Sequence, residues 1–472
     1  MSARVTTLAV TAAFLPVLLA AGQPSADRGP SATPIGSDPL RWSLGARTER
    51  VNVSTTGEQA NGMTFRGPMS ASGRFVAFSS TATNLVPEDH NGVEDVFVRD
   101  RELNDTIRVS IATTGEEANG PSYLPLLSGD GRLVAFRSVA TNLDPAGSQE
   151  VEGFFVHDLI TGFTERIALG PTGENPSRPR SGSRREVCDR WCVNAVSGDG
   201  SAFVFTSRGS RLVAGDRNGA RDVFVRAQGR TTRVTVGPMG EADGPSEGSS
   251  ISADGRFVAF RSFASNLVRR DTNRVPDLFV RDRVRGVTKR VNVSTAGEEA
   301  NRETFRPMLS ADGRFVGFRS VATNLVPGDS NRALDVFVHD RATGKTKRIS
   351  IATDRTQANA RGMSALVRHT LFMSRPFLSR HGRFAAFTSR APNLVRRDTN
   401  GHGDVFVHDL ETRETVRVSV SDRGGEAMSD SRVTGISADG RVVGFMSAAS
   451  NLVVRDTNGR RDYFVRVATP AP

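Results

Sequence analysis

Residues 252–260 read SADGRFVAF, and this stretch decides the fold because versions of it recur along the whole chain. The other copies are SASGRFVAF at 70–78, SGDGRLVAF at 128–136, SGDGSAFVF at 197–205, SADGRFVGF at 310–318, SRHGRFAAF at 379–387 and SADGRVVGF at 437–445. The fourth residue of every copy is a glycine, although the residues around it vary. Successive glycines are 58, 69, 55, 58, 69 and 58 residues apart. The sequence therefore contains seven copies of one unit, a pattern typical of propellers and solenoids.

Each unit predicts four strands, which we name A to D. Strand A precedes the SxDG turn. Strands B and C, as in residues 256–261 and 336–338, are apolar on both faces, whereas strand D, as in residues 290–293, alternates polar and apolar. A strand that is apolar on both faces has to be covered by protein on both sides, while an alternating strand can lie at the solvent-exposed edge of a sheet. The unit is therefore one blade of a β-propeller, with B and C sandwiched and D outermost.

The two ends of the chain predict how the ring closes. A D-type strand, residues 50–53, comes before any A strand, and the last strand, residues 463–466, is C-type. The strand counts match only if the N-terminal strand pairs into the last blade, which also removes an exposed edge. We predict an all-β fold: a seven-bladed β-propeller of four-stranded antiparallel blades. An open solenoid is the alternative, but it gives no reason to displace one strand from end to end.

The N-terminal sequence predicts export. Residues 1–22 have the features of a signal peptide: Arg4, an apolar stretch over 5–21, and small residues at 20–22. An uncleaved membrane anchor is the alternative, although the stretch is short and contains Pro16. We expect a disordered linker over 23–46, the propeller over 47–467 and a disordered tail over 468–472. The mature chain would be a secreted, extracellular or periplasmic monomer without a membrane span.

The net charge of +11 comes from arginine rather than lysine, because only Lys289, Lys345 and Lys347 among the 62 basic residues are lysines. The arginines are interleaved with acidic residues along the repeats instead of forming one run. With export, this distribution excludes nucleic acid from the expected partners. A protein or a cell-surface polysaccharide is the expected partner, the latter through long-range attraction of an anionic polymer.

The unit resembles the TolB-type propeller repeat, a relative of the WD-type blade. The resemblance covers residues 47–467, and its clearest part is the Asp254-Gly255 or Asp312-Gly313 turn with the strand that follows. It implies a propeller architecture. TolB proteins have six blades, so the seven units here depart from that family. Relatives with this propeller include peptidases and a pectate-type lyase.

The B–C and D–A connections are long and are expected on one face, while the A–B and C–D connections are short turns on the other. Binding residues usually lie on long loops. Two insertions precede strand A of blades 3 and 6 on this face; each is either a contact surface or a cover over the channel mouth. Their candidate binding residues are Arg184, Arg185, Trp191, Arg368, His369 and Phe372. Cys188 and Cys192 are expected to form a local disulfide, since two thiols are too few for a zinc site.

Six of the seven B–C loops contain Asp-x-Asn with a further Asp six residues after the first. These candidate metal residues are Asp89, Asn91, Asp95, Asp216, Asn218, Asp222, Asp271, Asn273, Asp277, Asp329, Asn331, Asp335, Asp398, Asn400, Asp404, Asp456, Asn458 and Asp462. The spacing is similar to the start of a calcium loop, but no Glu follows at the twelfth position. The alternative is that Asp and Asn cap tight turns. No cofactor is required, and Ca²⁺ is the candidate metal.

The sequence shows no convergent catalytic motif, nucleophile elbow or phosphate loop. His157, His339 and His408 share a strand C position with arginines in other blades, which we interpret as a solvated face; His369 with His402 is the one pair to check. We predict a binding or scaffold module, not an enzyme, that recognises a protein or glycan through its loop face. The alternative is a polysaccharide lyase or hydrolase acting at the channel mouth.

Overall fold

The computed structural model describes residues 40–42, 45–144, 152–167, 191–359 and 375–470. These residues belong to one compact unit, Pro39–Pro472. Within them, no helix has the length and hydropathy needed to cross a membrane.

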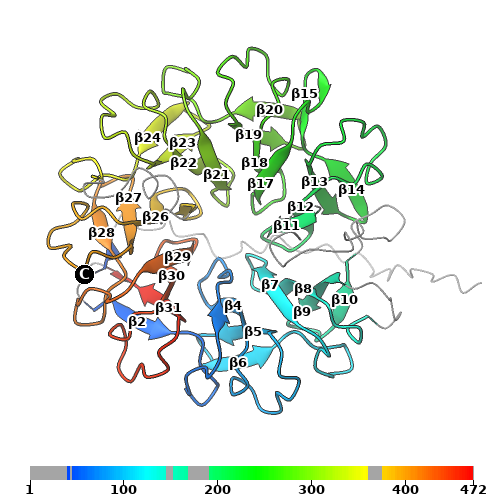
Figure 1. Cartoon of the computed structure of the whole chain (residues 1–472), viewed down its shortest axis with the longest axis vertical. Helices are drawn as coiled ribbons and strands as arrows, with labels where there is room; N and C mark the ends of the chain where they lie inside the picture. The colour runs from blue at the N-terminus through cyan, green and yellow to red at the C-terminus, as the bar shows by residue number, and fades with distance from the viewer. Residues whose placement is uncertain (1–39, 43–44, 145–151, 168–190, 360–374, 471–472) are drawn as a thin grey trace, which may run out of the picture. The chain divides into compact units, whose positions relative to one another are not determined.

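Seven four-stranded antiparallel sheets form the blades (Figure 1). From strand A to strand D, blade 1 is β3 (Thr64–Phe65), β4 (Phe75–Ser80), β5 (Asp95–Asp100), β6 (Asp105–Arg108); blade 2 is β7 (Ser122–Leu127), β8 (Leu133–Ser138), β9 (Gly153–Asp158), β10 (Thr164–Arg166); and blade 3 is β11 (Trp191–Val196), β12 (Ala202–Ser207), β13 (Asp222–Ala227), β14 (Arg230–Arg233). Blade 4 is β17 (Ser246–Ile251), β18 (Phe257–Ser262), β19 (Asp277–Asp282), β20 (Val287–Arg290), and blade 5 is β21 (Thr304–Leu309), β22 (Phe315–Ser320), β23 (Asp335–Asp340), β24 (Lys345–Arg348). Blade 6 is β25 (Phe377–Leu378), β26 (Phe384–Ser389), β27 (Asp404–Asp409), β28 (Thr415–Arg417), and blade 7 is β29 (Ser431–Ile436), β30 (Val442–Ser447), β31 (Asp462–Val467), β2 (Arg47–Arg50). Two further two-stranded pairs complete the strands: β1 (Leu40–Arg41) with β32 (Thr469–Pro470), from opposite ends of the chain, and the short hairpin β15 (Val236–Gly237) with β16 (Gly240–Glu241). The predicted all-β, seven-bladed fold is confirmed.

The ring closes as predicted, because β2 pairs with β31 and places Arg50 opposite Phe464. The D strands nevertheless begin three residues earlier than predicted, over 47–50 and 287–290 instead of 50–53 and 290–293. Regular pairing ends after Arg50, since the N–H of Val53 donates to the carbonyl of Val51 in a local turn. Val51 and Asn52 are fully buried although they follow the last residue of β2, so the buried segment extends further along the chain than the strand does.

Parts of the expected linker over 23–46 and tail over 468–472 lie within the described residues and take part in the fold, so the bounds of both segments stay predictions. Leu40 and Arg41 pair with Pro470 and Thr469. The side chains of Trp42, Ala46 and Ala468 are buried, and Trp42 and Ala468 join the apolar core of the last blades. Apolar burial therefore orders these flanking residues.

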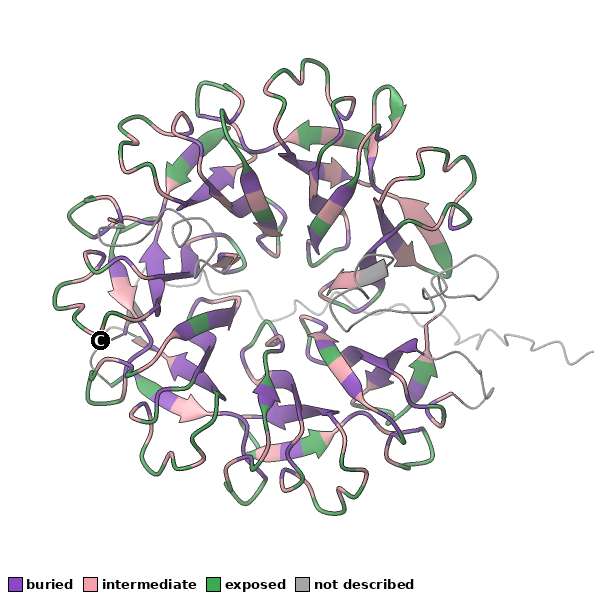
Figure 2. Ribbon diagram, in the orientation of Figure 1, coloured by how far each residue is buried: buried purple, intermediate pink, exposed green. Residues whose placement is uncertain are grey.

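The core lies within and between the blades, as the purple strands of Figure 2 show. In every blade a phenylalanine of strand B stacks on one of strand C, with ring centroids 5.5 to 6.0 Å apart. The pairs are Phe78–Phe97, Phe136–Phe155, Phe205–Phe224, Phe260–Phe279, Phe318–Phe337, Phe387–Phe406 and Phe445–Phe464. These stacked rings explain why strands B and C read as apolar on both faces.

The SxDG turns meet around the axis in a closed ring of backbone hydrogen bonds. In each blade one N–H donates to a carbonyl of the next blade: Ala71 to Gly129, Asp130 to Gly198, Gly198 to Ala253, Ala253 to Ala311, Asp312 to Arg380, Arg380 to Ala438 and Ala438 to Ala71. The turns need glycine for close approach as well as for conformation. At Gly440 (φ +81°), for example, a Cβ would lie 2.2 Å from Phe384 of the preceding blade. The axis is thus tightly surrounded by backbone at its A–B end.

Candidate functional site

The predicted metal-binding loops each enclose an arginine. In six blades the last residue of strand D lies between the two aspartates of the B–C loop, with nitrogen–oxygen distances of 3.1 to 3.7 Å to the first and 2.9 to 4.0 Å to the second. The arginines are Arg108, Arg233, Arg290, Arg348, Arg417 and Arg50, for blades 1, 3, 4, 5, 6 and 7. A guanidinium therefore balances the carboxylates in all six loops.

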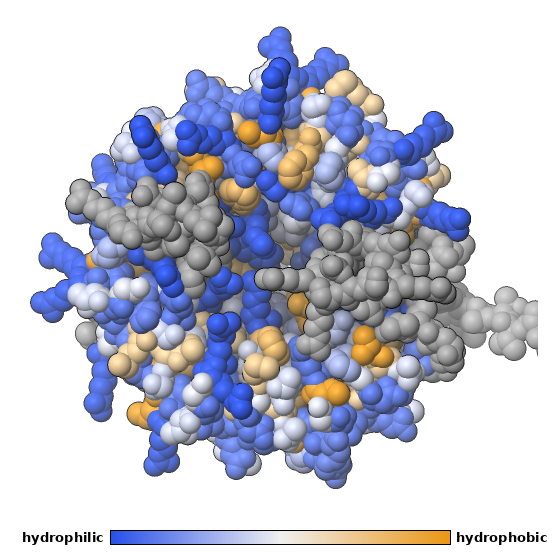
Figure 3. Space-filling model, viewed as in Figure 1, coloured by the Kyte–Doolittle hydropathy of each residue, from blue (hydrophilic) through white to orange (hydrophobic). Residues whose placement is uncertain are grey.

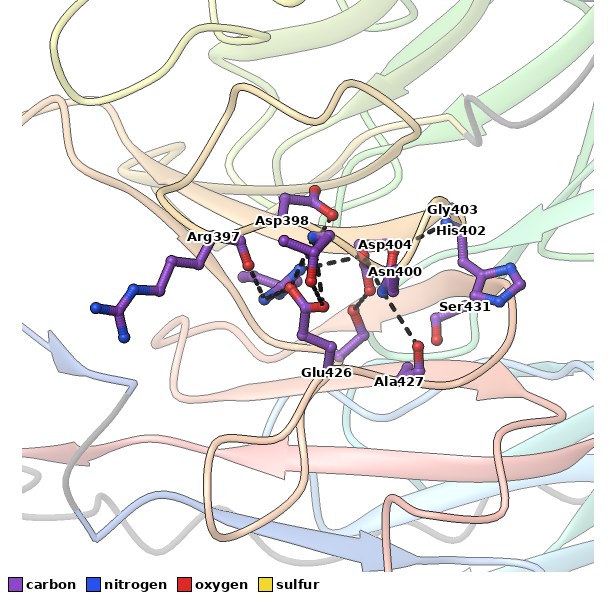
Figure 4. Close-up of polar contacts among 12 residues, drawn as sticks. Arg397, Asp398, Asn400, His402, Gly403, Asp404, Glu426, Ala427 and Ser431 are labelled. Atoms are coloured by element: carbon purple, nitrogen blue, oxygen red, sulfur yellow. Dashed lines mark hydrogen bonds and ion pairs between the residues drawn. The ribbon is translucent and has the colours of Figure 1, made fainter.

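The asparagine of each loop holds the turn, as blade 6 shows (Figure 4). The amide of Asn400 donates to Asp404 (2.8 Å) and to the carbonyl of Ala427 (3.1 Å), while its oxygen accepts the N–H of His402 (2.8 Å). The same donation to the last aspartate is made by Asn91, Asn218, Asn273, Asn331 and Asn458. This is the turn-capping geometry expected of Asp and Asn.

The carboxylates of these networks are buried, and burial raises the pKa of Asp95, Asp335 and Asp398 to about 6 despite their arginine partners. Within the residues that the structure describes, no group of three or more His, Cys, Asp or Glu side chains is arranged to hold a metal ion. Calcium binding stays a prediction, and the aspartates that it needs are ion-paired here with arginine.

The strand C position shared by histidine and arginine is buried, so its interpretation as a solvated face is wrong. His157, His339 and His408 are only 4, 5 and 3% exposed. Their Nδ1 atoms lie 2.8 to 2.9 Å from threonine hydroxyls of strand D, on Thr164, Thr346 and Thr415. Each threonine hydroxyl donates to a carbonyl of the preceding blade, on Ile111, Val293 and Ile351. The position is covered because the neighbouring blade packs against it.

Replacing His339 and His408 together by arginine, which occupies this position in other blades, should flatten the loss of stability in acid. Burial lowers the pKa of both histidines to about 4. The unfolded chain therefore binds more protons between pH 6.5 and 4, and the folded state loses up to about 3 kcal/mol per histidine as the pH falls through that range. Urea denaturation at several pH values measures the difference; identical pH profiles for variant and wild type would contradict the prediction.

Five arginines from blades 5, 6, 7 and 1 lie toward the end of the axis where the long loops attach. We call Arg66, Arg306, Arg319, Arg375 and Arg432 the axial arginine cluster. Arg66 and Arg306 stand two residues after the start of β3 and β21, and Arg432 is the second residue of β29. Arg375 precedes Pro376 as Arg306 precedes Pro307, and Arg319 is the penultimate residue of β22. In β21 the pairing with β22 shifts register between Phe305 and Met308, a bulge that re-aims the side chain of Arg306.

The charges of the cluster act on one another. Burial among protein atoms, followed by repulsion from Arg306 and Arg432, lowers the pKa of Arg66 and brings that of Arg319 to about 10. Burial, with repulsion from Arg66 and Arg306, also lowers the pKa of Arg375 to about 10. Arg66, Arg306 and Arg432 are nevertheless exposed to solvent.

Three members of the cluster differ from two neighbouring arginines that are ion-paired with acids. Arg137 pairs with Glu152 (2.7 Å), which also accepts the hydroxyl of Tyr123, and Arg261 pairs with Glu247 (2.8 Å). In contrast, Arg66, Arg306 and Arg375 make no ion pair in the described part of the chain. In Figure 3 the middle of the visible face is hollowed, and what can be seen of the hollow is hydrophilic.

The binding residues predicted from the sequence, namely Arg184, Arg185, Arg368, His369 and Phe372, lie outside the described residues, as does Cys188. Trp191 and Cys192 begin β11, but their side chains also lie outside the description. The disulfide and the contact surface therefore stay predictions. The axial cluster was missed by the sequence analysis, although the recurrence of TFR at 64–66 and 304–306, and of Arg-Pro at 306–307 and 375–376, carried the signal.

The chain is similar to several solved structures at low sequence identity. A TolB-like protein from Agrobacterium tumefaciens is 15% identical, with 78% of this chain and 95% of that chain covered and a TM-score of 0.38. An oligogalacturonate lyase from Vibrio parahaemolyticus is 10% identical, with 91% and 96% covered and a TM-score of 0.49. An acylaminoacyl peptidase from Pyrococcus horikoshii is 11% identical, with 87% and 52% covered and a TM-score of 0.47.

No protein-family model matches the chain, and no curated protein matches its sequence. These likenesses have identities below 25% and TM-scores below 0.5, so the fold is assigned from the strand pairing of this chain itself.

Proposed function

We propose that this chain is an exported β-propeller binding module that recognises a protein or a glycan through the face formed by its B–C and D–A loops. The observation that carries the proposal is the contrast between the two ends of the axis. One end is closed in by the ring of backbone hydrogen bonds between SxDG turns. The other end carries long loops and the axial arginine cluster, of which Arg66, Arg306 and Arg375 make no ion pair with the described residues.

The asymmetry among the blades supports a binding role at this end. The repeat supplies the same stacked phenylalanines and the same arginine–aspartate networks in nearly every blade. The axial residues differ from blade to blade, since the position of Arg306 is held by Leu124 in blade 2 and by Gly248 in blade 4. Variation at one end of a uniform scaffold is typical of a surface that binds a ligand.

The test compares exposed apolar side chains on the two faces. Phe65 and Phe263, at the loop end of the axis, are 39 and 51% exposed; Leu103 and Ile160, on C–D turns of the opposite face, are 71 and 76% exposed. Full-length protein, F65A/F263A and L103A/I160A are screened on an array of neutral and acidic glycans and against cell-surface protein extracts. We expect the F65A/F263A variant to bind the ligand captured by the wild-type protein in this screen with at least tenfold lower affinity. The L103A/I160A variant should bind it as the wild type does. Absence of any ligand, or equal loss in both variants, would contradict the proposed function.

A polysaccharide lyase or hydrolase at the channel mouth is the second candidate, favoured by one local convergence. Arg390 pairs with Asp430 (2.6 Å), and the ring of His402 lies 3.9 Å from the same carboxylate. Such a group could move a proton during chain cleavage. Incubation with acidic polysaccharides, followed by release of reducing ends, distinguishes the candidates: turnover that is lost in H402Q and D430N would favour the enzyme over the binding module.

A further inference from the structure

The strongest unexplained feature is the choice of arginine at one position of strand A. Arg66, Arg306 and Arg375 occupy this position in blades 1, 5 and 6. Leu124 and Gly248 occupy it in blades 2 and 4, and both share the positive φ of Arg306, +54°, +57° and +51°. The bulge conformation is therefore met by a leucine or a glycine, and the fold does not require a guanidinium there.

Arg66, Arg306 and Arg375 carry positive charges that no acid among the described residues pairs with. Burial, with repulsion from other arginines of the cluster, lowers the pKa of Arg66 and Arg375. Like charges held close together strengthen the attraction of this end of the axis for anions. Because the cluster spans four consecutive blades, it matches a ligand with several anionic groups better than a single ion.

Aromatic rings lie among these arginines. The ring centroid of Phe305 lies 5.1 Å from the guanidinium carbon of Arg261 and 5.9 Å from that of Arg319, and the ring centroid of Phe263 lies 4.7 Å from the guanidinium carbon of Arg261. Phe65 is at the position of Phe305 in blade 1, next to Arg66. The end of the axis thus offers planar guanidinium groups for oxyanions and apolar ring faces at the same site.

We propose that the axial arginine cluster binds an acidic oligosaccharide, one whose sugar rings carry carboxylate or sulfate groups. This inference rests on the proposed function and names the ligand class of the same face. Guanidinium groups form paired hydrogen bonds with carboxylate and sulfate oxygens, and the aromatic rings pack against the apolar faces of the sugars. A flexible oligosaccharide can place successive anionic groups against arginines of successive blades.

The first test uses four probes with the full-length protein: an alginate hexamer, a heparin-derived hexasaccharide, neutral maltohexaose and a single-stranded dT6 oligonucleotide. We expect calorimetry to show binding of at least one acidic hexamer at least tenfold tighter than maltohexaose. Binding of the alginate hexamer but not of the heparin hexasaccharide would indicate recognition of carboxylates. Binding of the heparin hexasaccharide alone would indicate that sulfate groups are required. Tighter binding of dT6 than of both acidic hexamers, or equal binding of maltohexaose, would overturn the proposal.

The second test removes the charges with a matched control. R66Q/R306Q/R375Q is compared with R230Q/R285Q/R413Q, in which three exposed arginines at the C–D turns of the opposite face carry the same change in net charge. We expect the first variant to lose at least tenfold in affinity for the acidic hexamer and the second to lose less than threefold. The melting temperature shows that both are folded. Equal affinities for the two variants would overturn the proposal.

The two tests separate the proposal from the proposed function. If F65A/F263A weakens binding of some other ligand while the arginine variants do not, the loop face binds but the acidic-sugar assignment is wrong. If no ligand is retained by any form of the protein, both fail together.

Discussion

A chain that begins at Val51 should fail to form the stable ring, whereas one that begins at Pro39 should behave as the full chain. Removing residues 39–50 takes away β2, which pairs with β31 from Arg47 opposite Val467 to Arg50 opposite Phe464. It leaves an unpaired, largely buried strand edge in the last blade, which is a template for aggregation. It also removes Arg50, the partner of the buried Asp456 and Asp462.

We expect the shortened chain to lose about 5 kcal/mol or more, because an unpaired buried carboxylate alone costs about 3 kcal/mol. For a domain of this size, that corresponds to a fall of roughly 10 °C or more in melting temperature, or to aggregation during purification. Calorimetry and size-exclusion chromatography measure both outcomes.

The control restores the strand from the other end of the chain. Residues 47–50 are attached after Val467 through a copy of the 341–344 turn, which joins strands C and D in blade 5. The melting temperature should recover if the closing strand is what was lost. A shortened chain that melts with the full-length protein would show that ring closure contributes little to stability.

The number and order of the blades could be predicted because each unit contains the residues that form its own turn and core. Every copy has a turn glycine at a position where a Cβ would approach the preceding blade, and a phenylalanine in strand B that stacks on strand C. Both features recur in every unit, so a single sequence pattern predicts all seven blades. The closure followed from the strand left over at each end.

The limits of the strands and the burial of strand C could not be read in the same way. Val51 and Asn52 are as buried as strand residues but lie beyond the end of strand β2, and hydrophobicity reports burial rather than regular pairing. His339 looks like a surface residue in a position where arginine also occurs, yet the next blade covers it. Contact between blades is a property of the ring and is absent from any single repeat.

The candidate site was the least predictable part. Arginines are spread through every unit, and in the sequence Arg290 and Arg306 look alike. In the structure the first is enclosed by three acids, while the second makes no ion pair with any acid in the described part of the chain. Which arginines are balanced depends on residues that the fold brings together from separate blades.

Replacing Arg290 by leucine should be among the most destabilising single changes in the protein. Its guanidinium lies 3.2 Å from Asp271 and 2.9 Å from Asp277, and it also pairs with Glu299. The side chains of Arg290 and both aspartates are at most 7% exposed. Removing the cation leaves buried negative charges uncompensated, and we expect a loss of about 3–5 kcal/mol in the free energy of unfolding at pH 7.

The same variant should regain stability in acid. Burial already raises the pKa of Asp271 to about 6 with the arginine in place, and without it the carboxyl is held protonated to a higher pH. The folded state then binds more protons than the unfolded chain above pH 4, so the deficit of R290L relative to wild type should shrink as the pH falls from about 7 to 4.

Urea denaturation of R290L, R290L/D271N and the control R285L between pH 4 and 8 tests this account. Arg285 lies on the C–D turn of the same blade and is exposed, so R285L should change the free energy of unfolding by less than about 0.5 kcal/mol. D271N should restore part of the lost stability in R290L at pH 7, because it removes one of the charges left without a partner. A deficit that is independent of pH, and unaffected by D271N, would mean that Arg290 acts through packing alone rather than by neutralising the buried acids.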